Sequence, residues 1–306
     1  MYLSRLELEG FRGTEHRVID AERVTVLPSG AAGCAVADAV DLFAAALDPA
    51  RLLATADRLG WRRPGTEATE GPEPELQELG SAGVAATLAR GVRALTVDAG
   101  LRLDPPLFGR LREHAVRDPR VVTALGQDPV VRIKVGWLFT RDHHMAHPSV
   151  LHVRIGDVGF DTSGKDRPVW LPELLGEVGR RFWRTSPLEP VDGIAERLLA
   201  ASLSPDPAVR AGFERLQSSL ALAPFSLPRL GLTRGDDQLS IVFGPDLVPL
   251  RQLGRAAYDA VRWAEAAFVV RPDVLVVDEP TSPELRAWWS GLTEMDDAPV
   301  EQVWVR

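Results

Sequence analysis

Two adjacent carboxylates, Asp278 and Glu279, directly follow the apolar run Val274–Val277 and precede Pro-Thr-Ser at 280–282. Four apolar residues in a row predict a strand buried on both faces. An aspartate at the carboxyl end of such a strand can hold Mg²⁺ through water. The next carboxylate can polarise an attacking water. The alternative interpretation is a core strand that ends in an acidic turn.

A loop of small residues occurs near the start of the chain, where phosphate chemistry needs one. Residues 24–27 predict a strand, 28–33 read Pro-Ser-Gly-Ala-Ala-Gly, and 35–47 carry apolar residues at helical spacing. A working phosphate loop reads G-x-x-x-x-G-K-[ST], in which backbone N–H groups wrap the phosphates and the lysine reaches the outer ones. The candidate residues here are Ser29, Gly30, Gly33 and Cys34.

The acidic segment resembles the Walker B motif of ABC ATPases. The N-terminal segment Leu-Glu-Leu-Glu-Gly-Phe-Arg-Gly at 6–13, which contains Arg12, resembles the opening strand of the RecF/SMC-like branch. Asp-Ala-Val at 38–40 is similar to the family's helix after the phosphate loop. The resemblance covers about the first 50 and last 70 residues. It implies an α/β P-loop NTPase fold, an ABC ATPase-like mixed sheet with a helical subdomain, and the cofactors ATP and Mg²⁺.

The phosphate loop departs from the family pattern. One alignment places Gly33 at the lysine and Cys34 at the hydroxyl; a shift by one places Cys34 and Ala35 there. Either alignment lacks the cation and the oxygen ligand. Lys165 is far away in sequence, and a solvated turn is the simpler interpretation of its Gly-Lys-Asp context. We therefore expect little or no ATP hydrolysis.

The family's L-S-x-G signature, which one protomer offers to its partner's nucleotide, would fall near 250–255. No serine stands there, and Arg251 and Arg255 flank Gly254. An arginine can meet a γ-phosphate bidentately, which predicts a partner-facing role for these residues. Solvated surface arginines are the alternative. The implied partners are a second copy of the chain, an intact ATPase or a nuclease.

Two further clusters of residues could bind a ligand, one a metal ion and the other nucleic acid. His143, His144 and His147 could bind zinc on a helix, but they lie between two predicted strands, which favours a solvated hairpin turn. Residues 180–184, Arg-Arg-Phe-Trp-Arg, mix cations with aromatics as nucleic-acid surfaces do. Helix amphipathicity explains the aromatics as core, so DNA contact stays an open alternative.

The expected organisation is one ABC ATPase-like domain over 1–306, with 51–240 as an inserted strand and helical subdomain and 64–75 as a flexible acidic loop. Further strands are predicted at 16–19, 130–139, 150–160, 239–243 and 301–305. Helices are predicted at 171–184, 192–222, 253–270 and 283–292, the second capped by Asp192.

Composition narrows the class of protein. One cysteine excludes an internal disulfide, and the net charge of −8 argues against whole-molecule attraction to nucleic acid. No apolar run is long enough for a membrane helix, so a cytoplasmic protein is expected. Three functions stay open: a non-hydrolysing regulatory or structural subunit, an ATPase with an atypical phosphate loop in DNA repair or phage defence, and a binding module for another ligand.

Overall fold

A computed structural model describes residues 1–11, 14–28, 31–52, 55, 59, 94–115, 118–125, 130–139, 146–160, 162, 167–185, 191–222, 226–227, 229–232, 239–243, 246–249, 252, 255–277, 283, 287–288, 291 and 300–305. The fold is mixed α/β and contains two compact units, Met1–Phe182 and Trp183–Val305. None of the described helices combines the length and apolar character that crossing a membrane requires.

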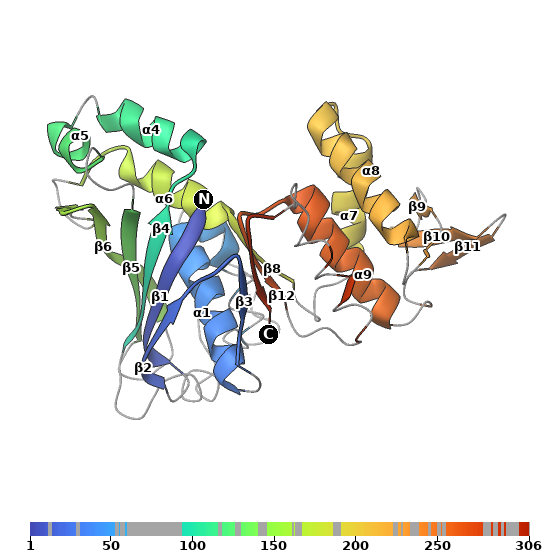
Figure 1. The fold of residues 1–306 in the computed structure, drawn as a ribbon, viewed down its shortest axis with the longest axis horizontal. Helices are drawn as coiled ribbons and strands as arrows, with labels where there is room; N and C mark the ends of the chain where they lie inside the picture. The colour runs from blue at the N-terminus through green and yellow to red at the C-terminus, as the bar shows by residue number, and fades with distance from the viewer. Residues whose placement is uncertain are drawn as a thin grey trace. The chain divides into compact units, whose positions relative to one another are not determined.

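The first unit is built on a six-stranded sheet in the order β2-β1-β4-β5-β6-β7, with every neighbouring pair antiparallel (Figure 1). Strands from the expected insertion therefore join the N-terminal strands in one sheet, because β1 pairs directly with β4. The strands are β1 (Tyr2–Phe11), β2 (Thr14–Asp20), β4 (Ala94–Arg102), β5 (Val130–Phe139), β6 (Ala146–Ile155) and β7 (Val158–Phe160). The short strand β3 (Val24–Val26) follows β2.

Alternation of apolar and charged residues gives this sheet one buried and one polar face. Leu6 and Leu8 are buried, whereas Glu7 between them is half-buried and Glu9 is exposed, which confirms the predicted pattern of β1. Cross-strand pairing keeps the register, since Leu8 lies opposite Val97 in β4. The buried face continues through Leu95, Ala99, Leu101, Val131, Ile133, Val135 and Trp137.

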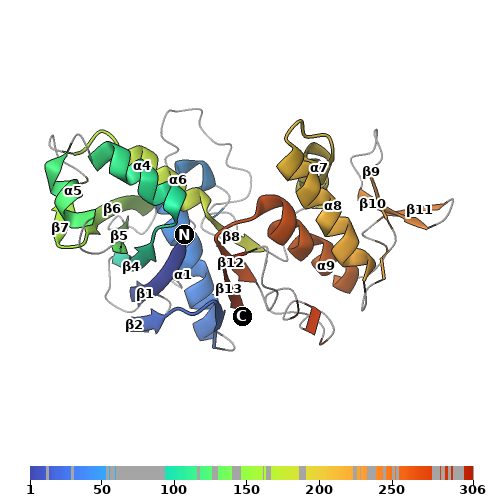
Figure 2. The same cartoon turned by 45° about the horizontal axis from the view of Figure 1, so that its top comes forward.

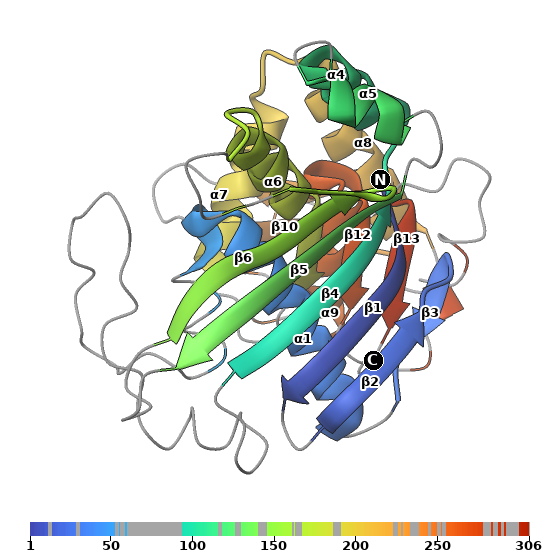
Figure 3. The ribbon, with the colours of Figure 1, turned by 90° about the vertical axis from the view of Figure 1, so that its left-hand side faces the viewer.

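Helix α1 (Ala31–Leu47) packs against the apolar face of the sheet, and Figure 3 shows it behind the strands. The Trp137 indole N–H donates to the Leu42 carbonyl oxygen at 3.3 Å and ties β5 to the helix. The helix begins at Ala31 and not at residue 35 as predicted. The predicted loop therefore ends earlier, and Gly33 and Cys34 belong to the first helical turn. The short helix η1 (Pro49–Arg51) follows α1.

Among the described residues of this unit, three more helices follow. α4 (Pro105–Ala115) and α5 (Pro119–Leu125) were not predicted, and α5 contacts β6 and β7 (Figure 2). α6 (Leu171–Arg180) packs on α1, where Gly179 approaches the backbone of Ala44 and Asp48 closely enough that a side chain would clash. The predicted helix 171–184 is too long, because Phe182–Thr185 forms strand β8.

The described part of the second unit contains three α-helices, α7 (Val191–Ser202), α8 (Pro207–Ala221) and α9 (Arg255–Glu265). Helix α9 runs into the π-helical segment η3 (Ala266–Val270). The single helix predicted over 192–222 is wrong. Pro207 begins a second helix, and the Asp206 carboxylate caps it by accepting from the Ala208 N–H. Asp192 lies inside α7 and is not its cap.

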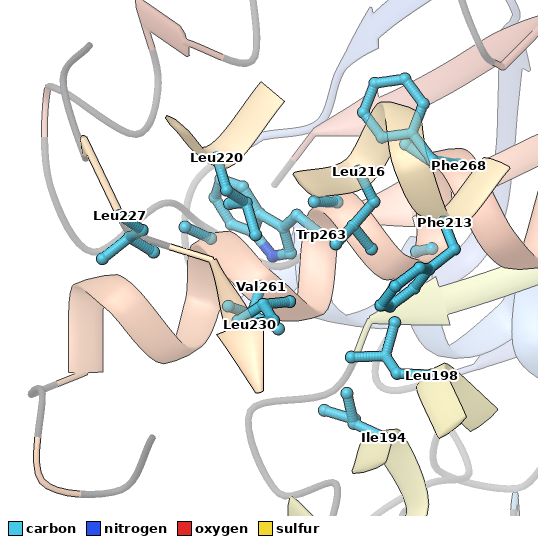
Figure 4. Packing of buried hydrophobic residues seen from close by; sticks show 14 of the residues in the cluster. Ile194, Leu198, Phe213, Leu216, Leu220, Leu227, Leu230, Val261, Trp263 and Phe268 are labelled. Carbon is cyan, nitrogen blue, oxygen red and sulfur yellow. The ribbon is translucent and has the colours of Figure 1, made fainter. Parts of the chain in front are cut away.

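Apolar side chains of these helices form the core of the second unit, shown in Figure 4. Trp263 of α9, which is fully buried, lies beside Leu216 and Leu220 of α8. The same cluster includes Leu275, Val277 and Val303, so the helices and the strands β12 (Val274–Val277) and β13 (Gln302–Val305) share one core. Both strands were predicted.

Strands of the second unit belong to two groups. β13, β12 and β8 are neighbours in that order, and β12 and β13 run parallel. β9 (Leu230–Leu232), β10 (Leu239–Phe243) and β11 (Asp246–Pro249) form a separate antiparallel sheet in the order β11-β10-β9. Residues 64–75 and most of 283–292 lie outside the described residues.

Candidate functional site

The carboxyl end of β12 is the candidate site for metal and nucleotide chemistry. All four residues of β12 are 0% exposed, and the register with parallel β13 runs from Val274 opposite Gln302 to Val277 opposite Val305. Asp278 and Glu279 lie outside the described residues. Both residues follow Val277 directly in the sequence. Ligands of α/β sheets bind at such carboxyl edges.

Strand β8 supplies two buried polar residues beside β12. The Thr185 hydroxyl, 0% exposed, donates to the Val276 carbonyl oxygen at 3.4 Å. The adjacent Arg184 is 7% exposed, which places a guanidinium inside the unit. Sequence reasoning missed both, because it continued a predicted helix to Arg184 and assigned no strand to residues 182–185. The available signal was the run Phe-Trp-Arg-Thr, whose aromatic and β-branched residues favour a strand.

The predicted phosphate loop leads into α1. Arg12, Ser29 and Gly30 lie outside the described residues. Gly33 is buried in the first turn of the helix, and Cys34 beside it is half-buried and forms no disulfide. The described residues of that turn, Ala31 to Cys34, contain no basic side chain. They contribute backbone N–H groups and a thiol, and no cation for a phosphate.

Three polar residues lie along one face of α1, an arrangement that sequence reasoning did not identify. Cys34, Asp38 and Asp41 recur at spacings of four and three residues, which places them on one face of the helix. The two aspartates are 4% and 3% exposed. Among the described residues, no group of three or more His, Cys, Asp or Glu side chains is arranged to hold a metal.

At the predicted partner-facing segment, only Arg255 is described, since Arg251 and Gly254 lie outside the described residues. Arg255 is the first residue of α9, and its side chain is 67% exposed. Its Nε atom lies 3.7 Å from the carboxylate of Asp259, which also contacts Arg262 at 3.1 Å. Asp259 and Arg262 are buried, so Arg255 is the solvent-facing member of a three-residue charge ladder.

Residues 180–184 do not form one exposed basic surface. Only Arg180 is exposed, while Phe182 and Arg184 are buried in β8. Arg181 donates to Asp104 at 2.6 Å and to Glu177 at 3.2 Å, which ties the end of α6 to the start of α4. The interpretation of the aromatics as one face of a helix is wrong: they belong to a strand.

The histidine cluster is placed in part. His143, His144 and Lys165 lie outside the described residues, whereas His147 is in β6, which begins at Ala146 and pairs with β5.

The segment predicted as one strand over 150–160 contains a turn, where Gly156 has a φ of +55°. A β-carbon there would also crowd the Ala124 carbonyl oxygen at 3.2 Å.

The polar face of the six-stranded sheet carries a network of charges, and Figure 3 shows this face turned toward the viewer. Glu7 accepts a hydrogen bond from His16 at 2.8 Å and lies 3.6 and 3.8 Å from Arg5 and Arg132. The hydrogen bond from His16 is the main cause that lowers the pKa of Glu7. Arg132 also donates to Asp98 at 3.1 Å. Oppositely charged side chains therefore lie next to one another on this face.

Comparisons with known proteins leave the family open. No family model matches the chain, and neither does any curated protein. Two solved structures of the recombination mediator protein RecF in the RecFOR pathway, RecF-ATPrS and RecF-ATP, align with TM-scores of 0.40 and 9% identity. The alignments cover 99% and 100% of this chain and 91% and 93% of those chains. A TM-score of 0.40 is too low to assign family or function to this chain.

Proposed function

We propose that this chain is a nucleotide-binding protein of the ABC-ATPase type with incomplete hydrolytic machinery, acting as a regulatory or structural subunit beside an intact ATPase or nuclease. The observation that carries the proposal is strand β12, which is wholly buried, parallel to β13 and directly followed by Asp278 and Glu279. A carboxylate pair at the carboxyl edge of a parallel strand suits a hydrated Mg²⁺ and the nucleotide that accompanies it.

The start of α1 supports the loss of hydrolysis. Gly33, in the first turn, brings no cation to the position that the resemblance gives to the phosphate-loop lysine. Charge that develops on a transferring phosphoryl group needs fixed positive groups, and removing one such group typically costs two to three orders of magnitude in rate, roughly 3–4 kcal/mol. Backbone N–H groups of the helix can still hold a phosphate without turning it over.

The test separates binding from turnover. We expect calorimetric titration of the full chain with ATP and MgCl₂ to show binding, and steady-state phosphate release to stay at the level of Glu279→Gln. Asp278→Asn should weaken the Mg²⁺-dependent part of binding, whereas Asp246→Asn, at the exposed start of strand β11, should leave it unchanged. Release that disappears in Glu279→Gln would identify an active ATPase. Absence of ATP binding together with a co-purifying non-nucleotide compound would identify a different binding module.

The partner role rests on the exposed Arg255 at the start of α9. We propose that Arg251, Gly254 and Arg255 face the nucleotide of a partner ATPase, to whose γ-phosphate an arginine donates bidentately. Arg255→Ala should slow phosphate release by an intact ATPase encoded beside this chain, whereas Arg229→Ala, an exposed arginine of the same unit, should not. If the two proteins do not associate in the presence of ATP, or if Arg255→Ala leaves the rate unchanged, the partner role is excluded. A parallel measurement with duplex DNA tests DNA as a second partner.

A further inference from the structure

The polar face of the six-stranded sheet is divided into an acidic half and a basic half. Residues directly opposite each other on neighbouring strands lie on the same face, and one row of such residues crosses this face from β1 to β6. In that row Glu7 lies opposite Asp98, and Asp98 lies opposite Lys134. His152 lies opposite Lys134 and completes the row. The rows on either side add three charged residues to the two halves: Glu9 on β1, Arg132 on β5 and Arg154 on β6.

Each half keeps charge that is open to a partner. Arg132 has two acids within 3.8 Å, whereas Arg154, directly opposite it, is exposed and forms no ion pair with any described carboxylate. Two arginines opposite each other repel, which destabilises the sheet of a single chain. On the acidic half, Arg5 lies 3.6 Å from Glu7, but Glu9 is still 60% exposed. An acidic surface over β6 and a basic surface over β1 would offset these charges.

A β-bulge in β6 adds an apolar side chain to the same face. The pairing of β5 with β6 shifts between Lys134 and Val135, which makes Leu151 an extra residue. Its side chain covers Gly136 on the polar face, because a β-carbon at Gly136 would lie 2.7 Å from the Leu151 Cδ1 atom. Leu151 is 42% exposed. An apolar residue surrounded by charged ones is the usual composition of a protein interface, with its apolar core and polar rim.

We propose that this face binds the same face of a second copy of the chain, related by a two-fold axis that runs parallel to the strands between β4 and β5. Such an axis lays β1 of one copy over β6 of the other, and β4 over β5, so each acidic half meets a basic half. In the central row, Glu7 then faces the partner's His152, and Asp98 faces the partner's Lys134. The partner's Arg154 lies over β1, beside its acids.

The face is large enough for a stable dimer. Strands β1, β4, β5 and β6 contain 9 or 10 residues each and β2 contains 7. With about 3.3 Å per residue and about 4.8 Å between strands, they cover roughly 700 Å². Specific complexes bury about 800 Å² on each partner, which is of the same order. Nucleic acid fits this face less well, because its phosphates would meet the carboxylates of the acidic half.

Charge reversal tests the dimer with the full chain and without nucleotide. We expect sedimentation to show a dimer at about 50 mM NaCl that weakens at about 500 mM. The double variant His152→Glu/Arg154→Glu on β6, and Glu9→Lys on β1, should each raise the Kd of the dimer at least about tenfold. These three residues are exposed, so the thermal midpoint should stay unchanged. Arg112→Glu and Glu113→Lys, exposed on α4, are the matched controls and should leave the dimer intact.

Mixing the two weakened variants tests the two-fold arrangement itself. The β6 variant and Glu9→Lys should form a heterodimer about tenfold tighter than either forms alone, because one of its two contacts keeps the natural charges and the other exchanges them. The β6 variant mixed with Glu113→Lys should gain nothing. Arg255→Ala should not affect this dimer, since the inference is independent of the proposed function.

Three results would overturn the proposal. The first is a wild-type chain that stays monomeric at about 100 μM, a concentration at which even a weak dimer would form. The second is a mixture of the two variants that remains monomeric. The third is a monomer that binds a labelled oligonucleotide and loses it in the β6 variant, which would assign the face to nucleic acid.

Discussion

The carboxylate of Glu265 is wholly buried and accepts a hydrogen bond at 2.5 Å from the Nε atom of Arg197. The pair joins the last residue of α9 to α7, and the Arg197 guanidinium lies 5.3 Å above the Trp183 ring. Glu265→Gln keeps the shape of the side chain and removes its charge. Since Arg197 is 32% exposed and partly solvated, we expect a loss of about 1–3 kcal/mol in the free energy of unfolding, measured in urea. Glu196→Gln, on the exposed side of α7, should change it by less than about 0.5 kcal/mol. Equal effects of the two substitutions would contradict a buried ion pair.

Gly212 of α8 faces the Phe268 carbonyl oxygen of η3, and a β-carbon at Gly212 would lie inside van der Waals contact with that oxygen. The obstacle is backbone, which cannot rotate away as a side chain can. Gly212→Ala should therefore destabilise the chain by about 1–3 kcal/mol, although alanine favours a helix. Gly109→Ala is the matched control, because a β-carbon there meets nothing within 4 Å. That variant should be neutral or more stable by up to about 1 kcal/mol, measured as the thermal midpoint. A stabilised Gly212→Ala would show that α8 and η3 are not in close contact.

Asp104 caps α4, and its titration should make the stability of the chain depend on pH in the acidic range. Burial raises its pKa, but the Leu107 N–H at 3.0 Å and Arg181 at 2.6 Å stabilise the carboxylate more, so the pKa is lowered from 3.8. The stabilisation is therefore complete above about pH 4 and is lost as pH falls through the lower folded-state pKa. The midpoint difference between wild type and Asp104→Asn should be large at about pH 7 and shrink toward about pH 2–3. Glu113→Gln, exposed on α4, serves as control. A difference that does not change with pH would refute the charge-based explanation.

Arg51 of η1 contacts the backbone at the end of α6. One guanidinium nitrogen donates to the carbonyl oxygens of Gly179 at 2.8 Å and Phe182 at 2.6 Å. Arg51→Met keeps the aliphatic stem and leaves both carbonyls without this donor, so we expect a loss of about 2 kcal/mol in unfolding free energy. Arg51→Lys should fall in between. Arg180→Met, at the exposed end of the same helix, should cost less than about 1 kcal/mol. A lysine variant no better than methionine would mean that packing, and not the donated bonds, matters.

The sequence predicted individual strands and helices better than it predicted which of them pair or pack together. Periodicity located β1 and α9, because a half-buried strand and an amphipathic helix repeat at different intervals, and an unbroken apolar run located β12. It could not show that β1 pairs with β4, which follows more than 80 residues later, since such pairing depends on tertiary packing. The errors at 180–185 and 203–207 have local causes. Apolar residues continue past Arg180 and past Ser202, and the turn signal Ser-Pro-Asp-Pro at 204–207 received too little weight.

At the candidate site, the sequence predicted the acidic motif and the strand before it, but not the strand β8 beside it. The apolar run of β12 and the acids after it could be predicted from the sequence, because apolar residues give way abruptly to charged ones there. The burial of Arg184 in β8 could not be predicted, because the sequence does not distinguish a buried arginine from a surface arginine. Its burial depends on which strand lies beside it. The thiol and aspartates along α1 were likewise hidden, since small and polar residues occur on both exposed and buried helix faces.

The π-helical segment Ala266–Val270 also affects how this chain should be aligned with related ones. A π turn holds one residue more than an α turn, and Arg271 ends the segment in the left-handed conformation, with a φ of 51°. A relative that lacks one residue here would continue α9 as a regular α-helix into the same strand. Alignments should therefore permit a one-residue gap between 266 and 270. Without that gap, every position of β12 and the acid pair after it would be compared with the wrong neighbour.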